Sequence, residues 1–419
     1  MLSTARPSGA LPRVAATTLA AAGVVLAAFN VASGAALWWS VYQAQPPAGT
    51  DYLALFAGAT LFAQDPSRLY DIAAQQAVQE AVVHPGRLAA GVLPYPYPPH
   101  VAALLAVPAA LGYGRSFALL GAVNLVVMAL AVAVIARRAG LRRSGALWLV
   151  TIAAASLPVA FTVVQGQVSL AVLLLMSLFV FDHRDGRSAR AGLWLGLLAF
   201  KPQLLVVPVL LMVRARQWRG LLTGVGVVAL TWLPTLPRVG LSAAEGYGRL
   251  LLALGSAHDT LGVHPDRMFN LRALGAALLS EPWSALGWAV AVSVTLLLVG
   301  RRSTVACRDR GAAHLRLAAA VIAALLVSPH LNLHDLALLV LVAGLLLAGN
   351  GRALPLGAAA GALALVALPL PVVVLAPDGA AAAMVPAVLA AVFLALVWLS
   401  ERRERLPAGP TAEPSASLP

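Results

Sequence analysis

Long apolar runs constrain this chain more than any other feature of its sequence. They recur from one end to the other, for example at 15–41, 116–136 and 283–300. A helix needs about 20 apolar residues to cross the hydrocarbon core of a bilayer. The runs are continuous and do not alternate with polar residues, as the strands of a membrane barrel would. They predict an all-α, polytopic integral membrane protein.

Composition supports this class of protein. Residues of the set AVILMFWYC make up 60% of the 419 positions, and only 11% are charged. Soluble domains carry about 45–50% apolar and about 25% charged residues. A soluble fold of this length has too little interior to bury so much apolar surface, whereas lipid can cover it. We expect about 10–13 transmembrane helices, with helical outer loops between some of them.

Two of the apolar segments are interrupted by polar residues. Lys201-Pro202-Gln203 divides 191–213, and the stretch 328–335 divides 317–349. The uninterrupted or divided spans are expected at 15–41, 116–136, 146–164, 167–181, 220–236, 283–300, 317–349, 353–376 and 380–399.

Arginines account for most of the formal net charge of +13. They cluster in short segments between the apolar runs, as expected of cytoplasmic loops that retain positive charge. This distribution argues against nucleic-acid binding. The clusters lie at 137–143, 184–190, 214–219, 301–310 and 402–405. The single cysteine, Cys307, lies in one of these loops, so an internal disulfide is excluded.

The chain is expected to form a single transmembrane domain over 1–406, followed by a disordered Pro/Ser/Ala-rich tail at 407–419. The run from Ala15 is long enough to span, so we interpret it as a retained first helix with a cytoplasmic N-terminus. A first outer loop then covers 42–97, and a second covers 238–282.

Topology has two solutions. If every run crosses fully, the loops at 137–143 and 182–190 lie outside, against the charge rule. If 98–112 is a short helix that does not fully cross and 191–213 is a pair of half-helices, every basic loop returns inside. We favour the second solution, which places Lys201, the 328–335 break and the 42–97 loop near the outer face.

Lys201 is the strongest candidate functional residue, because it is the only lysine and lies far from the basic loops. Ionisable groups at membrane depth are costly and usually functional. Pro202 opens the helix there by removing a backbone donor. A compact ammonium in a broken helix suits a phosphate. The structural alternative is a lysine that extends to the interface.

The 328–335 break contributes His330, His334 and Asp335. The two histidines are four residues apart and would share a face if the segment were helical. Zinc is disfavoured because further ligands are absent nearby, and the prediction is no metal. Binding of an anion or a sugar is the preferred interpretation. The alternative is a pair of interfacial histidines that cap a kinked helix.

Asp51 follows the first expected helix and is followed by Tyr52. As a helix N-cap it would be structural. As a general base it could take the proton from an acceptor hydroxyl that attacks a sugar carbon. A phosphate leaving group needs cations rather than a second carboxylic acid.

Weaker candidates come from the loops. Arg68 lies in a polar turn between Asp65 and Asp71, Tyr97 in a proline-rich segment, and Gln167 in Gln165-Gly166-Gln167. Structural interpretations are preferred for the two turns, although the amides of the second could reach sugar hydroxyls. Arg249, Arg267 and Arg272 of the second outer loop could meet a phosphate.

The order of these motifs resembles glycosyltransferase family 87, of the GT-C class of polytopic membrane transferases. The resemblance extends from about residue 15 to 349 and rests on six motifs in order. They are Asp51-Tyr52 through Gly58, Asp65-Pro66 through Asp71, Tyr97-Pro98-Pro99, Gly166-Gln167, Ala199-Phe200-Lys201-Pro202-Gln203, and Ser328-Pro329-His330 through Asp335-Leu336.

The resemblance implies roles for the matching residues. Asp51 takes the position of the catalytic base, Lys201 that of the lysine near the donor phosphate, and His334 that of the first of two adjacent histidines. Asp335 replaces the second histidine, which indicates a less characterised branch of the family. With these roles, the donor-phosphate candidates are Lys201, His334 and Arg249. The candidate contacts to sugar or acceptor are Tyr97, Gln167, Gln203, His330, Asp335 and Arg68.

Characterised members of the family use polyprenyl-phosphate mannose to build α-1,2-mannosides in actinobacterial envelopes. The resemblance therefore implies an inverting, metal-independent and cofactor-free hexosyltransferase, acting at the outer face of a bacterial plasma membrane. Its partners would be a polyprenyl-phosphate sugar donor and a lipid or glycan acceptor. The alternative is a transporter or lipid flippase, because broken helices with buried charge are common in transporters. Transporters often contain paired repeats, and none is evident in this sequence.

Overall fold

The computed structural model of the chain describes residues 10–45, 50–88, 91–256, 261, 263–301, 307, 309–348, 356–367 and 383–405. These residues form helices and connecting loops, and none of them belongs to a β-sheet. Together with the membrane-spanning helices below, this confirms the prediction of an all-α polytopic membrane protein. The predicted disordered tail, 407–419, lies outside the described residues.

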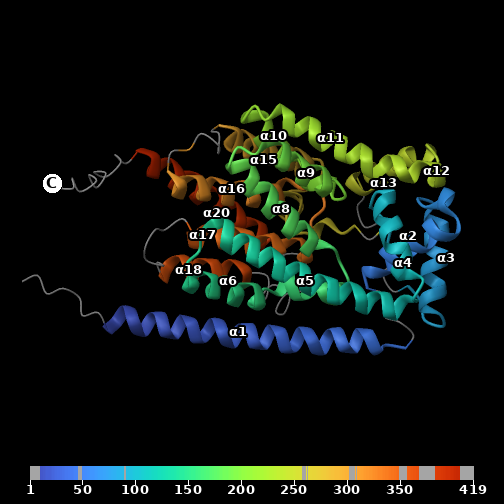
Figure 1. Cartoon of the computed structure of the whole chain (residues 1–419), viewed down its shortest axis with the longest axis horizontal. Coiled ribbons are helices and arrows are strands. Elements are labelled where there is room, and N and C mark those ends of the chain that lie inside the picture. The colour runs from blue at the N-terminus through green and yellow to red at the C-terminus, as the bar shows by residue number, and fades with distance from the viewer. Residues whose placement is uncertain are drawn as a thin grey trace, which may run out of the picture.

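The helices fall into three consecutive groups (Figure 1). The first group is α1 Ala10–Gln43, α2 Tyr52–Gln64, α3 Ile72–Val83, α4 Pro99–Ala109, α5 Tyr113–Ala139, α6 Arg143–Ala155 and α7 Leu157–Gln165. The second is α8 Ser169–Arg184, α9 Ser188–Leu198, α10 Val206–Arg214, α11 Trp218–Trp232, α12 Leu236–Val239 and α13 Ser242–Ser256. The third is α14 Leu271–Leu278, α15 Trp283–Gly300, α16 Arg310–Val327, α17 Leu339–Ala348, α18 Leu356–Ala367 and α20 Met384–Arg405. Short 3-10 helices include η1 Pro66–Arg68, η2 Pro202–Leu204 and η5 Leu333–Leu338.

Full-length spans are fewer than the 10–13 predicted. Among the described residues, six helices are long and apolar enough to cross a membrane, or seven if the bent pair α6–α7 counts as one span. The six are Val14–Gln43 of α1, α5, Trp218–Val239 of α11 and its short continuation, α15, α16 and α20. Predicted crossings such as 167–181 correspond to shorter helices, because α8 has only 16 residues. Apolar composition alone did not separate full crossings from short buried helices.

Two short elements agree with the half-helix topology. The 11 residues of α4 give a helix of about 16 Å, too short for a hydrocarbon core of about 30 Å. The segment 191–213 is also divided, since α9 ends at Leu198 and α10 begins at Val206, with η2 between them. The residues that interrupt the two helices are therefore those that the sequence singled out.

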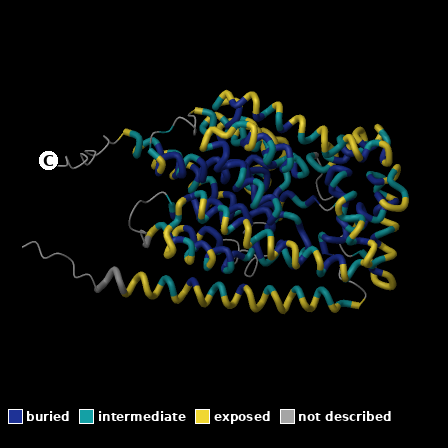
Figure 2. Tube along the Cα trace, viewed as in Figure 1, coloured by how far each residue is buried: buried dark blue, intermediate teal, exposed yellow. Residues whose placement is uncertain are grey.

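The core lies along α16 and α17. All but a few residues of α16 are buried, whereas α1 exposes most of its length (Figure 2). Large apolar side chains such as Phe29, Leu222 and Leu297 are 62%, 73% and 70% exposed on the outer helices. Lipid is the solvent that such a surface requires.

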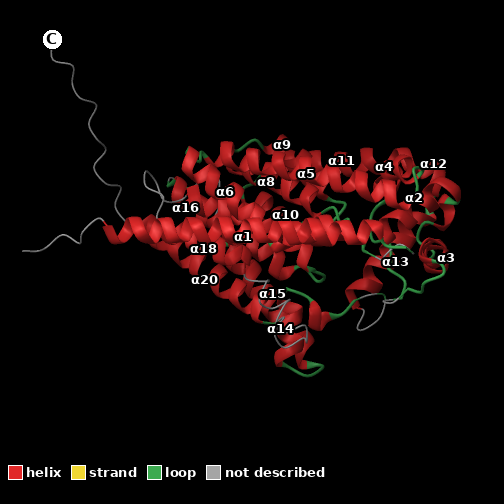
Figure 3. Ribbon diagram, turned by 90° about the horizontal axis from the view of Figure 1, so that it is seen from below, coloured by secondary structure: helices red, strands yellow, loops and turns green. Residues whose placement is uncertain are grey.

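The two ends of the bundle differ in character. Helices α2, α3, α4, α12 and α13 gather at one end, on the right in Figure 1 and in the orthogonal view of Figure 3. At the other end, α1 begins and α20 ends. This second end carries the basic segments, which are joined by contacts between Arg138 and Asp182, Arg184 and His314, His183 and Gln217, and Arg403 and Asp309. The basic loops therefore lie together, as the half-helix topology requires.

Helices α9 and α11 cross at unusually close range through two pairs of glycines. A Cβ at Gly192 would overlap the backbone carbonyl of Gly220, and one at Gly196 would overlap Gly224 and Val227. Small residues spaced by four allow helix backbones to approach in a membrane. This crossing fixes α9, whose C-terminal end leads directly to Lys201.

We predict that Gly192→Leu strongly destabilises the protein, because the added side chain must force the two backbones apart. Overpacking of this kind costs about 1–3 kcal/mol or more. Thermal unfolding of the purified protein measures the effect. The matched control is Gly226→Leu on α11, where a Cβ meets nothing within 4 Å. Equal unfolding temperatures for the two variants would contradict the close crossing.

Candidate active site

A cavity of about 310 Å³ lies at the end of the bundle that carries α2 and α13. Segments far apart in the sequence line it, including the start of α2, the 93–97 loop, the Lys201 break and the 328–335 break. Eight of the predicted site residues are among its lining residues: Asp51, Tyr97, Gln167, Lys201, Gln203, His330, His334 and Asp335. The structure thus brings most of the candidates into one cavity.

Asp51 lies at the N-terminal end of α2, but its side chain does not cap that helix. Its carboxylate is 33% exposed and accepts a hydrogen bond from Nε2 of Gln167 at 3.1 Å. The backbone N–H of Asp51 donates to Oε1 of Gln165 at 3.1 Å. The N-cap interpretation therefore does not explain this side chain. The carboxylate is held in place and remains open to the cavity.

A tight turn between α7 and α8 presents Gln167 to Asp51. Gly166 adopts the left-handed conformation at φ +64°, and a Cβ there would press on Tyr52 and Phe117. The Tyr97 hydroxyl donates to Oε1 of Gln167 at 2.9 Å, so the amide nitrogen is directed at Asp51. The sequence predicted sugar contacts for Tyr97 and Gln167, but here both position the carboxylate.

Lys201 is buried within the break between α9 and α10. Its ammonium donates to Oδ1 of Asp335 at 2.5 Å and to the Ser169 hydroxyl at 3.1 Å. The two side chains of the ion pair are only 5% and 3% exposed. Lys201 is thus not a snorkelling lysine, because its charge is satisfied inside the protein at the edge of the cavity.

Asp335 and His334 occupy η5, which follows the polar break. Asn332 and Asp335 form a capping box, and Oδ2 of Asp335 accepts from the Asn332 N–H at 3.3 Å. The His334 ring lies between two carboxylates, with Nδ1 3.6 Å from Asp51 Oδ2 and Nε2 3.5 Å from Asp335 Oδ2. A polar chain therefore runs from Asp51 through His334 and Asp335 to Lys201.

His330 and Gln203 line the same cavity without joining this chain. Nε2 of His330 lies 3.3 Å from the Asn332 side-chain nitrogen. Residues 328–332 are not helical, so the shared helix face considered for His330 and His334 does not form. Within the described part of the chain, no group of three or more His, Cys, Asp or Glu side chains is arranged to hold a metal ion.

Arg68 and Arg249 do not line the cavity, unlike the other predicted binding residues. Arg68 pairs with Asp71 three residues later, and Arg249 pairs with Glu245 one turn earlier, both at the surface. The pKa of Asp71 lies below its ordinary value because the Ala74 N–H donates to the carboxylate, with a smaller contribution from Arg68. These local ion pairs account for both arginines.

Three site residues were missed in the sequence. Ser169 bridges Lys201 and Asp335, Gln165 anchors the Asp51 backbone, and Asn124 donates to the Gln167 carbonyl at 2.9 Å. Asn124 carried a usable signal, because it is a lone amide within the apolar run of α5. Ser169 carried none, since serine is common in membrane helices.

A family model described as glycosyltransferase family 87 matches residues 95–329, more than half of the chain. The chain belongs to glycosyltransferase family 87. It is therefore a membrane glycosyltransferase, in agreement with its membrane-spanning helices. The matched segment includes Tyr97, Gln167 and Lys201, whereas Asp51 precedes it and His334 follows it. No curated protein and no solved structure matches the chain significantly.

We predict that Lys201→Met destabilises this glycosyltransferase, because it leaves the Asp335 carboxylate buried without its cation. Breaking a buried pair in this way costs about 3–5 kcal/mol. The double variant Lys201→Met/Asp335→Asn removes both charges and should recover much of the lost stability. Thermal unfolding of both purified variants measures this recovery. A double variant no more stable than the single one would show that the ion pair is not the cause.

Proposed function

We propose that this glycosyltransferase moves a hexose, specifically mannose, from a polyprenyl-phosphate donor to a lipid or glycan acceptor. The reaction inverts the anomeric centre and needs no metal ion. The observation that carries the proposal is the shared cavity of Asp51 and Lys201, with an exposed carboxylate on one side and a buried ammonium on the other. The choice of mannose rests on the resemblance to characterised members of the family.

Asp51 is the proposed general base. An acceptor hydroxyl in the cavity gives its proton to the carboxylate while its oxygen attacks the anomeric carbon of the donor. The bond from that carbon to the phosphate breaks on the opposite side, so a single displacement inverts the configuration. Gln167 supports this role because it donates to Oδ2 and leaves the other carboxylate oxygen without a hydrogen bond from any described residue.

The leaving phosphate is proposed to lie near Lys201 and the two histidines. An ammonium has three donors, and two of those on Lys201 are used by Asp335 and Ser169. Nδ1 of His330 and Nδ1 of His334 are buried without a hydrogen-bond partner among the described residues. These nitrogens and the third N–H of Lys201 are suited to the oxygens of a monophosphate, whose charge needs no divalent cation.

We place the cavity at the outer face of a bacterial plasma membrane. The support is the basic character of the opposite end, because cytoplasmic loops retain arginine and lysine. Since α1 begins at that basic end, the N-terminus lies in the cytoplasm in this orientation. A polyprenyl chain can then stay in the bilayer while its phosphate enters the cavity. Family membership favours this function over transport or lipid flipping.

Asp51→Asn is expected to reduce sugar transfer by about 10²–10⁴-fold, because the amide cannot accept the hydroxyl proton. The assay follows label from polyprenyl-phosphate mannose with purified protein in the presence of a metal chelator. Asp65→Asn is the matched control, since Asp65 lies in the same outer segment and contacts only Ser67 through its side chain.

Retained activity of Asp51→Asn would overturn the proposed base. Loss of wild-type activity on chelation would overturn the metal-free mechanism separately. An active wild type that uses another polyprenyl-phosphate hexose, but not mannose, would correct the sugar alone.

Gln167→Met should lower transfer about tenfold while Asp51 remains present, because a charge-assisted hydrogen bond of about 1.5 kcal/mol is lost. The pKa of Asp51 should also rise, which moves the acidic limb of the rate–pH profile to higher pH. Tyr97→Phe is the companion variant, with a smaller effect, because it frees the amide without removing it. A loss of rate with an unmoved pH profile would assign Gln167 to substrate contact instead.

A further inference from the structure

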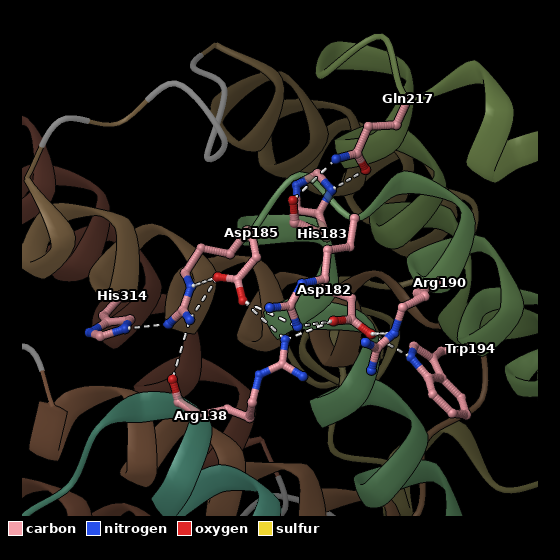
Figure 4. Close-up of polar contacts among 10 residues, drawn as sticks. Arg138, Asp182, His183, Asp185, Arg190, Trp194, Gln217 and His314 are labelled. Carbon is pink, nitrogen blue, oxygen red and sulfur yellow. Dashed lines mark hydrogen bonds and ion pairs between the residues drawn. The ribbon is translucent and has the colours of Figure 1, made fainter.

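A second cluster of charges surrounds the turn between α8 and α9, at the basic end of the molecule (Figure 4). Its centre is Asp182, whose side chain is fully buried. The carboxylate is surrounded by donors from Arg138 at 2.7 Å, Trp194 at 2.8 Å, and Arg187 and Arg190 at 3.3 Å. It is therefore saturated and cannot neutralise further positive charge.

Asp185 forms the second acidic position of this cluster. It pairs with Arg138 at 3.1 Å and with Arg184 at 2.8 Å. Burial acts to raise the pKa of Asp185, but the hydrogen bonds and charges of Arg184 and Arg138 hold it below its ordinary value. Two charged aspartates thus face four arginines, which leaves a surplus of positive charge at the surface.

A surface groove of about 670 Å³ opens beside this cluster, between the start of α9 and the start of α11. Arg187, Arg190 and Arg219 line it. The side chains of Arg187 and Arg190 are 48% and 54% exposed, so each guanidinium keeps free donors besides those used by Asp182. Arg219 is exposed and makes no ion pair with any residue that the structure describes.

The groove selects for charge rather than for neutral polar groups. The hydroxyl of Ser188 donates to the Gln217 carbonyl, and that of Thr223 donates to the Arg219 carbonyl. Neither hydroxyl is left as a donor. The two helix N-termini add partial positive charge to that of the arginines. The fitting ligand is an anion with several oxygen atoms.

An apolar stripe continues from the groove along α11. Leu222, Gly226 and Leu230 follow Arg219 at three- and four-residue spacing and therefore share its face of the helix. The two leucines are 73% and 70% exposed, and a Cβ at Gly226 would meet nothing within 4 Å. The stripe offers an uncovered apolar path next to a cationic site.

We propose that this groove binds an anionic phospholipid, with the phosphate at Arg187, Arg190 and Arg219 and an acyl chain along Leu222 and Leu230. Charge complementarity supports the headgroup, because basic pockets between membrane helices bind anionic lipids. The stripe supports a lipid over a soluble phosphate, which would leave the leucines unused. The site is separate from the catalytic cavity, at the opposite end of the bundle.

The test titrates short-chain phosphatidylglycerol into the full-length protein in neutral detergent and follows thermal unfolding and lipid retention by native mass spectrometry. Phosphatidylglycerol should raise the unfolding temperature, whereas phosphatidylcholine should not. Arg219→Gln should weaken phosphatidylglycerol binding about fivefold, the factor for about 1 kcal/mol per basic residue. Arg143→Gln is the matched control, as an exposed arginine at the start of α6 that does not line the groove.

Leu222→Gln separates a lipid from a soluble anion. It should weaken phosphatidylglycerol binding but leave any effect of glycerol 3-phosphate unchanged. The proposal is overturned if glycerol 3-phosphate or inorganic phosphate stabilises the protein as strongly as phosphatidylglycerol. It is also overturned if Arg143→Gln weakens lipid binding as much as Arg219→Gln, since the attraction would then be diffuse.

Discussion

The buried ion pair between Lys201 and Asp335 is the interaction on which the site depends. Each residue lies in a segment where a helix is broken, and neither charge could remain in this interior without the other. Their pairing joins the α9–α10 break to the turn before α17. Through His334, the same pair extends to Asp51 at the mouth of the cavity. The catalytic end is thus organised by charges that only a partner makes tolerable.

The two ends of the bundle use buried carboxylates in opposite ways. Asp182 is surrounded by donors from four side chains and is closed to any ligand. Asp51 is positioned mainly by one amide and remains partly exposed. The first arrangement ties basic loops together, and the second keeps an acceptor free for chemistry. Residue type alone does not separate these two environments.

Much of the site was readable from the sequence because each break interrupts an apolar run. Lys201 and the 328–335 segment were predicted for that reason, as was Asp51 at the end of the first helix. The pairing of Lys201 with Asp335 was not predicted, because it joins residues 134 positions apart. Arg68 and Arg249 were wrongly included among the binding candidates, although their acidic partners lie three and four residues away. The number of full spans was also too high, since a short core helix such as α17 is as apolar as a full crossing.

The long separations within the site have a consequence for biogenesis. Asp51 and Gln167 are 116 residues apart, and Lys201 precedes Asp335 by 134. A chain made from its N-terminus inserts Lys201 well before its counter-ion has been synthesised. Until then, the α9–α10 segment carries an uncompensated charge and has reason to remain near the interface. Assembly of the cavity therefore belongs to the last stage of membrane insertion, after the ribosome has passed the 328–335 break.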